Sequence, residues 1–61
     1  MKKKELKVGM IINDCHRDPE FDEEVIEVCY NGFFTKLNSG INAYDYSELK
    51  EFEIIKDEFG N

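Results

Sequence analysis

The stretch VIEVCYNGFFTKL, residues 25–37, places two β-rich runs on either side of an Asn–Gly pair. Valine, isoleucine, phenylalanine and tyrosine are enriched in strands, and alternation puts Ile26, Val28 and Tyr30 on one face of the first run. Asn31–Gly32 between such runs is the strongest short-range hairpin signal, because a type I′ turn needs positive φ at both central residues. The sequence therefore predicts an antiparallel hairpin with its turn at Asn31–Gly32.

Upstream of this hairpin, ELKVGMII (residues 5–12) shows the period of a half-buried strand. Its alternating apolar residues are Leu6, Val8, Met10 and Ile12. Gly9 interrupts the run and indicates a bulge or the close approach of another backbone. The next ten residues, NDCHRDPEFD (13–22), have the composition of a loop, and Phe21 is the residue expected to anchor this loop to the domain.

The segment after the hairpin continues the β pattern. NSG (residues 38–40) predicts a second turn, and INAYDYS (41–47) predicts the strand that follows it. Tyr44 and Tyr46 fall on one face of that strand, where a ring can pack on the core and leave its hydroxyl outside. These tyrosines are candidate partner-binding residues, since aromatic side chains line the grooves that take up Pro-rich peptides.

The last part of the chain is predicted as a short turn and a strand. SELK (47–50) fits a single helical turn, opened by Ser47 and closed by Lys50. EFEII (51–55) then resumes the alternation of a strand. An alternative joins residues 46–59 into one helix, but the apolar spacing fits a helix only partly, and the paired isoleucines favour a strand.

The size of the chain limits what it can build. Sixty-one residues, of which 41% are hydrophobic, are enough for one domain but leave little interior for a deep catalytic pocket. The composition divides the chain into a basic arm (1–5), a β domain (6–56) and a C-terminal tail (57–61). Five short strands left open would expose bare edges, which favours closure into a barrel.

Three stretches resemble SH3-like domains of the KOW type. LKVGMII (6–12) is similar to their opening strand, in which an acidic residue typically follows Val–Gly; here Met10 stands in that place. VIEVCYNGFFTKL is similar to their central hairpin, and YSELKEFEII (46–55) to their closing turn and strand. The resemblance implies an all-β fold, a five-stranded SH3-like small barrel with one short helical turn before the last strand.

The chain is acidic, with 14 Asp and Glu residues, 8 Lys and Arg residues and a formal net charge of −6. This balance opposes direct binding to nucleic acid or to anionic membranes, both of which rely on Lys and Arg. It favours a partner with a basic surface. The segment RDPEFDEEVIEV (17–28) concentrates carboxylates that are candidate partner-binding residues: Asp18, Glu20, Asp22, Glu23, Glu24 and Glu27.

These side chains do not predict a metal site or a catalytic site. A calcium loop starting at Asp18 would need glycine in its sixth place and an acid in its twelfth, where Glu23 and Cys29 stand. A zinc site built on Cys15, His16 and Cys29 lacks the paired ligand spacing of structural zinc. We therefore predict no catalytic residue, no metal ligand and no cofactor.

The cysteines and the absence of a sorting pattern predict a cytoplasmic protein. The apolar stretch near the N-terminus is shorter than a secretory signal requires, and no segment approaches a membrane span. Two cysteines are too few for a disulfide framework, so reduced thiols are expected. A single disulfide between Cys15 and Cys29 stays open as an alternative.

Together these features predict a non-enzymatic protein-binding module. Size, acidity and fold resemble those of accessory proteins encoded by phages or mobile elements, including anti-CRISPR-like inhibitors. The resemblance implies a larger host protein as partner, one that handles nucleic acid or serves defence, with carboxylates standing in for phosphates. The alternative is a KOW/SH3-like nucleic-acid-binding or assembly subunit that uses its lysines, namely Lys2, Lys3, Lys4, Lys7, Lys36 and Lys50. A homodimer formed through an uncovered edge strand is also compatible with the pattern.

Overall fold

The computed structural model describes residues 5–14 and 18–56. Its elements are β1 (Ile11–Asp14), η2 (Pro19–Phe21), β2 (Glu23–Val28), β3 (Gly32–Leu37), β4 (Gly40–Asp45), η3 (Tyr46–Glu51) and β5 (Phe52–Lys56). The prediction of an all-β fold with five strands and one short helical turn before the last strand is confirmed. The alternative of a single C-terminal helix is wrong, because Phe52–Lys56 is a strand.

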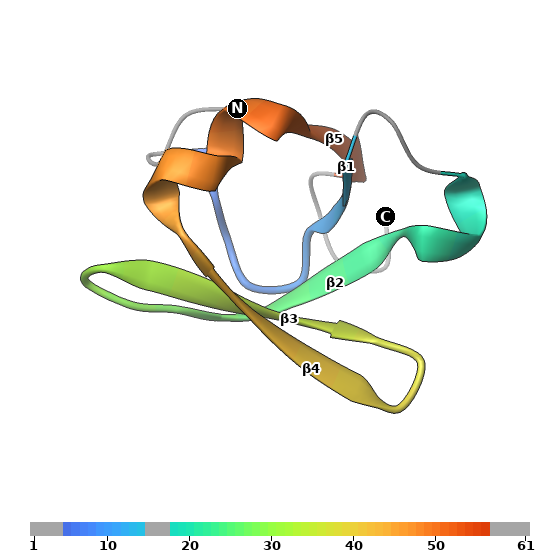
Figure 1. Ribbon diagram of the computed structural model, residues 1–61, viewed down its shortest axis with the longest axis horizontal. Helices are drawn as coiled ribbons and strands as arrows, with labels where there is room; N and C mark the ends of the chain where they lie inside the picture. Colours follow the sequence, from blue (N-terminus) through green and yellow to red (C-terminus); the bar gives the residue numbers. More distant parts are fainter. Residues whose placement is uncertain (1–4, 15–17, 57–61) are drawn as a thin grey trace.

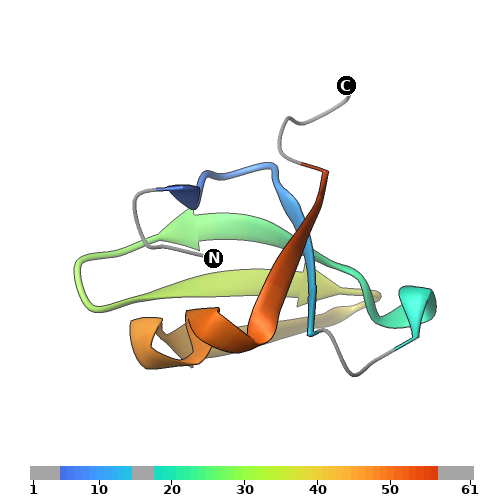
Figure 2. The same cartoon turned by 90° about the horizontal axis from the view of Figure 1, so that it is seen from above.

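The five strands form one antiparallel sheet in the order β4-β3-β2-β1-β5. The sheet is strongly bent, so that β1 and β5 cross over the layer formed by β2, β3 and β4 (Figures 1 and 2). The predicted closure into a barrel is wrong for the described residues, because β4 and β5 are the two edges of the sheet. The chain passes from one edge to the other through η3, which contacts both strands.

The turn between β2 and β3 differs from the predicted type I′ turn. The Cys29 N–H donates to the Gly32 carbonyl at 2.8 Å, which centres the turn on Tyr30 and Asn31. Among the described residues, positive φ occurs only at Gly9 and Asn38, so neither Asn31 nor Gly32 has the backbone of a type I′ turn.

Gly32 is needed for a different reason, which is the close approach of β4. A Cβ atom at this position would lie 2.4 Å from the Tyr44 carbonyl oxygen, a contact that real side chains do not make. Gly32 and Asp45 are register partners at the end of the β3–β4 ladder. The glycine therefore lets the two strands stay in contact as far as their last pair.

The first predicted strand is shorter than the sequence indicates. Gly9 has a φ of 97°, which turns the chain and leaves Val8 exposed, so only Ile11–Asp14 is a strand. Two hydrogen bonds still join this turn to β2: the Gly9 N–H donates to the Val25 carbonyl, and the Val25 N–H donates to the Met10 carbonyl. The predicted irregularity at Gly9 is thus a left-handed turn, the conformation that glycine adopts most readily.

A bulge changes the faces of β2. The register with β3 shifts between Val25 and Glu27, which inserts an extra residue on the β2 side. Val25 is fully buried, whereas Val28 is partly exposed and Tyr30 is 93% exposed. The predicted common face of Ile26, Val28 and Tyr30 is therefore not maintained.

The core lies between the bent sheet and η3. Its buried apolar residues are Leu6, Met10, Ile12, Val25, Phe33, Leu49 and Phe52. Phe33 is at its centre: its ring centroid lies 5.4 Å from that of Tyr44, 5.9 Å from that of Tyr46 and 6.1 Å from that of Phe52. Four rings in contact contribute much of the apolar area that so short a chain can bury.

Candidate functional site

The acidic segment runs through the loop between β1 and β2 and then along β2. Asp18, Glu20 and Glu27 are exposed, and Asp22 and Glu24 are half-buried. Asp18, Glu20 and Asp22 belong to the part of the loop around η2, residues 18–22, which we call the η2 loop. Glu24 and Glu27 belong to β2, so negative charge extends from the loop onto the sheet. Not every carboxylate of the segment is exposed to solvent, however.

The η2 loop is held in place by Asn13, which is 5% exposed. The Asn13 side-chain amide donates to the Asp18 carbonyl at 3.1 Å and to Asp22 Oδ1 at 2.7 Å. Within the loop, the Phe21 N–H donates to the Asp18 carbonyl at 2.9 Å. The loop is thus fixed by a buried amide of β1, and Phe21, the predicted anchor, is half-buried.

Glu23 differs from the other carboxylates of the segment because its side chain points into the fold and is 2% exposed. Oε1 accepts hydrogen bonds from Thr35 Oγ1 and, at 3.2 Å, from Asn42 Nδ2. The Tyr44 hydroxyl lies 3.0 Å from Oε1 and 3.1 Å from Oε2. The carboxylate is therefore used inside the sheet, by one donor on β3 and two on β4.

This network satisfies the hydrogen-bonding needs of the interior. Thr35 is fully buried, and among the described residues every buried side-chain nitrogen or oxygen has a hydrogen-bond partner. A buried carboxylate is costly unless its oxygens are bonded, and here neutral donors from β3 and β4 meet that need. Sequence reasoning grouped Glu23 with the surface acids; its alternation with the buried Val25 was the signal that places it inside.

The two candidate tyrosines are engaged within the fold. Both are half-buried and pack on the core. The Tyr44 hydroxyl belongs to the Glu23 network, and the Tyr46 hydroxyl donates to the Cys29 carbonyl. Tyr44 therefore links β4 to β2, and Tyr46 links η3 to the turn that follows β2.

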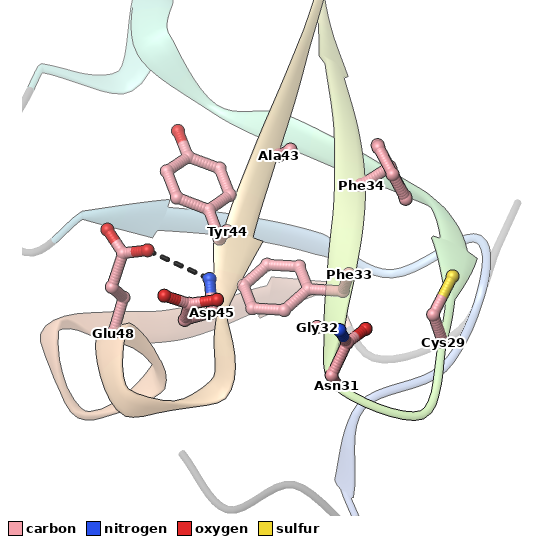
Figure 3. A pocket seen from close by; sticks show the side chains of 9 residues that line it. All are labelled: Cys29, Asn31, Gly32, Phe33, Phe34, Ala43, Tyr44, Asp45 and Glu48. Carbon is pink, nitrogen blue, oxygen red and sulfur yellow. Dashed lines mark hydrogen bonds between the residues drawn. The ribbon is translucent and has the colours of Figure 1, made fainter.

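A pocket of about 220 Å³ lies at the open end of the β3–β4 hairpin, away from its turn (Figure 3). It is lined by Cys29, Asn31, Gly32, Phe33, Phe34, Ala43, Tyr44, Asp45 and Glu48. The register pairs Gly32 with Asp45 and Phe34 with Ala43, which places these four on the face opposite Phe33. Sequence reasoning missed this pocket, because it depends on the register and on the missing side chain at Gly32.

Glu48 closes one side of the pocket. Its Oε2 accepts a hydrogen bond from the Asp45 backbone N–H at 2.9 Å (Figure 3). Asp45 and Glu48 form a capping box at the start of η3, so the residue that opens this turn is Asp45 and not the predicted Ser47. The capping box also brings two carboxylates to the pocket.

Cys29 is a free thiol on the other side of the pocket. Its Sγ donates to Glu27 Oε2 at 3.3 Å. This hydrogen bond raises the pKa of the Cys29 thiol above its ordinary value, and burial and the negative charge of Glu27 raise it further. The shift lowers the fraction of thiolate, which is the nucleophilic form, at any given pH.

Several other predictions concern metals and lysines. Among the described residues, no group of three or more His, Cys, Asp or Glu side chains is placed to hold a metal ion. Cys15 and His16, on which the zinc hypothesis depends, lie outside the described residues, as does the lysine run at 2–4. Lys7, Lys36 and Lys50 are exposed, as are most lysines of folded proteins.

Two further findings concern membrane spans and the similarity of the chain to known proteins. The described residues contain no helix with the length and apolar character that crossing a membrane requires. Comparisons with protein-family models, with curated proteins and with solved structures each found no match for this chain.

Proposed function

We propose that this chain is a non-enzymatic protein-binding module that engages a basic surface of a larger protein. The partner is a nucleic-acid-handling or defence protein, and the chain acts on it as an acidic accessory protein or inhibitor of the kind that phages and mobile elements encode. Its carboxylates take the place of nucleic-acid phosphates in the partner's basic groove. In this view the chain works in the cytoplasm of the host cell.

The observation that carries the proposal is the exposure of the acidic loop. Asp18 and Glu20 point to solvent from a loop that Asn13 fixes, so the charges are presented on an ordered backbone. Ordered charges recognise a partner more strongly than the same charges on a mobile tail, because less conformational entropy is lost on binding. Net charge of −6 adds long-range attraction toward a basic surface.

The relation to SH3-like domains is part of the same proposal. The strand order β4-β3-β2-β1-β5 and the 3-10 turn before β5 support it. Such small sheets serve many unrelated functions, so the fold adds only that a small β domain is a suitable carrier for a binding surface.

The test compares two variants that lose the same charge. Asp18→Asn/Glu20→Gln alters the η2 loop, and Glu51→Gln/Glu53→Gln removes two exposed carboxylates from η3 and β5. Each variant and the wild type are immobilised and used to capture proteins from a lysate of the host cell. We expect one basic protein, identified by mass spectrometry, to be retained by the wild type and the control and to be lost by the loop variant.

Nucleic-acid mimicry has its own readout. Double-stranded DNA added to the captured complex should release the partner, because both ligands occupy the same basic groove. Equal capture by the loop variant and the control variant would refute the role of the loop, and retention in the presence of excess DNA would refute mimicry.

The alternative proposal is a nucleic-acid-binding or assembly subunit that uses exposed lysines such as Lys7, Lys36 and Lys50. Lys36 lies opposite Glu24 in the β2–β3 ladder, so a carboxylate neighbours this cation. A salt-dependent shift of plain DNA by the purified chain would favour this alternative over the first proposal.

A further inference from the structure

The β4 edge of the sheet offers unpaired backbone groups in a regular pattern. β3 and β4 pair without interruption from Gly32↔Asp45 to Leu37↔Gly40. In an antiparallel ladder, successive residues alternate between bonding to the partner strand and facing away from it. Because Leu37 and Gly40 flank a two-residue turn and bond to each other, Ile41, Ala43 and Asp45 direct their backbone groups outward.

One of these outward groups is already bonded, and this supports the assignment. The Asp45 N–H donates to the Glu48 carboxylate, which lies beyond the edge of the sheet. Within residues 5–14 and 18–56, the outward N–H and C=O groups of Ile41 and Ala43 remain as the open part of the edge. The Ile41 side chain is 66% exposed and that of Ala43 is also exposed, so no side chain of the edge itself covers these groups.

The opposite edge is protected in ways that β4 is not. β5 carries Glu53 and Lys56, and its pairing with β1 shifts register after one pair. Charged side chains and irregular pairing are the features by which natural sheets discourage the addition of a further strand. β4, with the sequence GINAYD, has neither lysine nor proline and only one charge, at its last residue. The two edges are thus unequal, and β4 is the open one.

The pocket described above adjoins this open edge and is negatively charged at one side. Ala43 and Asp45 of β4 line it together with Glu48 and Phe34. A side chain that enters it from a strand beside Ala43 would meet carboxylates and an aromatic ring, which together suit the aliphatic stem and cationic head of lysine or arginine.

We propose that β4 takes up an extended basic segment of the partner protein as an added strand, with a lysine or arginine of that segment in the pocket beside Asp45 and Glu48. The inference rests on the proposed function, since it specifies how the basic partner is held. A second copy of this chain is a poorer occupant, because each copy carries a net charge of −6 and would repel the other.

The test uses a synthetic peptide of alternating valine and lysine with blocked ends, and the same peptide with glutamate in place of lysine. Each is titrated into the full-length ¹⁵N-labelled chain, and amide shifts and hydrogen exchange are recorded. We expect the lysine peptide to shift the Ile41 and Ala43 amides and to slow their exchange, with no effect of the glutamate peptide. The amides of Asn42 and Tyr44, which bond to β3, should change less.

Two variants at one position give the matched control. Ala43→Pro removes an outward donor at a site where an edge strand tolerates proline, and Ala43→Val keeps the donor. Both substitutions enlarge the side chain that lines the pocket, but only Ala43→Pro also removes a backbone hydrogen bond, so binding of the lysine peptide should be about tenfold weaker in Ala43→Pro than in Ala43→Val. Amide spectra of both variants show directly that each remains folded.

Three results would overturn the inference: equal effects of the two peptides, equal affinities of the two variants, or exchange protection of Ile41 and Ala43 that rises with protein concentration alone. The third would assign the edge to a second copy, which sedimentation would register as a dimer. Failure here is distinct from failure of the proposed function, because the capture experiment reads the η2 loop through Asp18 and Glu20 and leaves β4 intact.

Discussion

Two buried polar residues organise two regions of this molecule, and they do so in opposite ways. In the β2–β4 region, Glu23 is an acceptor that gathers donors from Thr35, Asn42 and Tyr44. In the loop between β1 and β2, Asn13 is a donor that holds acceptors of the loop in place. The first links three strands of the sheet, and the second orders a surface.

This difference separates carboxylates that look alike in the sequence. Glu23 and Glu20 lie three positions apart in one acidic run, yet the first is enclosed by the sheet and the second is in solvent. Loss of the first should therefore cost folding free energy, whereas loss of the second should affect binding alone.

Glu23→Ala should have the largest effect on stability. Removing the carboxylate leaves the fully buried Thr35 hydroxyl without its acceptor and opens a cavity, at a cost of about 3 kcal/mol. A chain of this size has a total stability of about 3–9 kcal/mol, so this variant should lose at least about a third of it. Urea unfolding followed by circular dichroism measures the change.

Glu23→Gln is the matched control for that prediction. The amide keeps an acceptor for Thr35 and offers a donor to the Tyr44 hydroxyl, so the loss should be about 1 kcal/mol. Equal losses in the two variants would mean that the bonded network contributes little, and would remove the distinction drawn between Glu23 and the exposed acids.

Gly32→Ala should be the next most destabilising change. The added Cβ would lie 2.4 Å from the Tyr44 carbonyl, so β4 must move, at a cost of about 2 kcal/mol. Gly40→Ala is the control, because its Cβ would meet nothing closer than the Leu37 carbonyl at 3.7 Å. Similar urea midpoints for both variants would contradict the close approach at Gly32.

Asn13→Ala should loosen the loop with a smaller effect on the sheet. Two hydrogen bonds are lost, which corresponds to about 1–2 kcal/mol. The Phe21 and Asp22 amides, which bond within the loop, should exchange with solvent faster than in the wild type, while the Thr35 amide remains slow. Uniformly faster exchange would show instead that loop and sheet open together.

Glu27→Gln should change the reactivity of Cys29 without a measurable loss of stability. Because the hydrogen bond to Glu27 raises the thiol pKa, the wild type holds less thiolate at a given pH than an ordinary cysteine does. Removing the charge lowers this pKa, so the pH profile of alkylation by iodoacetamide should move to lower pH. The measurement is made with Cys15 replaced by serine, and Glu24→Gln, on the same strand, should leave the profile in place.

The sequence predicted the elements of this fold better than their junctions. Alternation and an Asn–Gly pair located the β2–β3 hairpin, because burial on one face imposes a period of two. The turn type at Asn31–Gly32 was wrong because the demand on Gly32 comes from Tyr44, twelve residues away, and no local pattern contains that contact. Closure into a barrel was wrong for a similar reason, since it depends on how η3 joins the edges.

The candidate site was predicted only in part. The run of acidic residues identified the charged loop, but composition cannot distinguish the exposed Glu20 from the enclosed Glu23. Alternation with Val25 places Glu23 on the inner face, but the donors that satisfy its carboxylate there, Thr35 and Asn42, come from two other strands. Asn13 was missed because a lone asparagine, next to the last residue of β1, carries no signal of the loop acceptors that it binds.

The hydrogen bond from the Tyr46 hydroxyl to the Cys29 carbonyl has a consequence for folding. It joins the first residue of η3 to the turn that ends β2, across seventeen residues of sequence. In a hairpin that forms early, the Cys29 carbonyl has no donor from the protein until η3 has docked, which couples the hairpin to the C-terminal part of the sheet in one transition. Partial detachment of β5 and η3 should therefore break the hydrogen bond to the Cys29 carbonyl at the hairpin turn. We expect the small domain to unfold as a single cooperative unit.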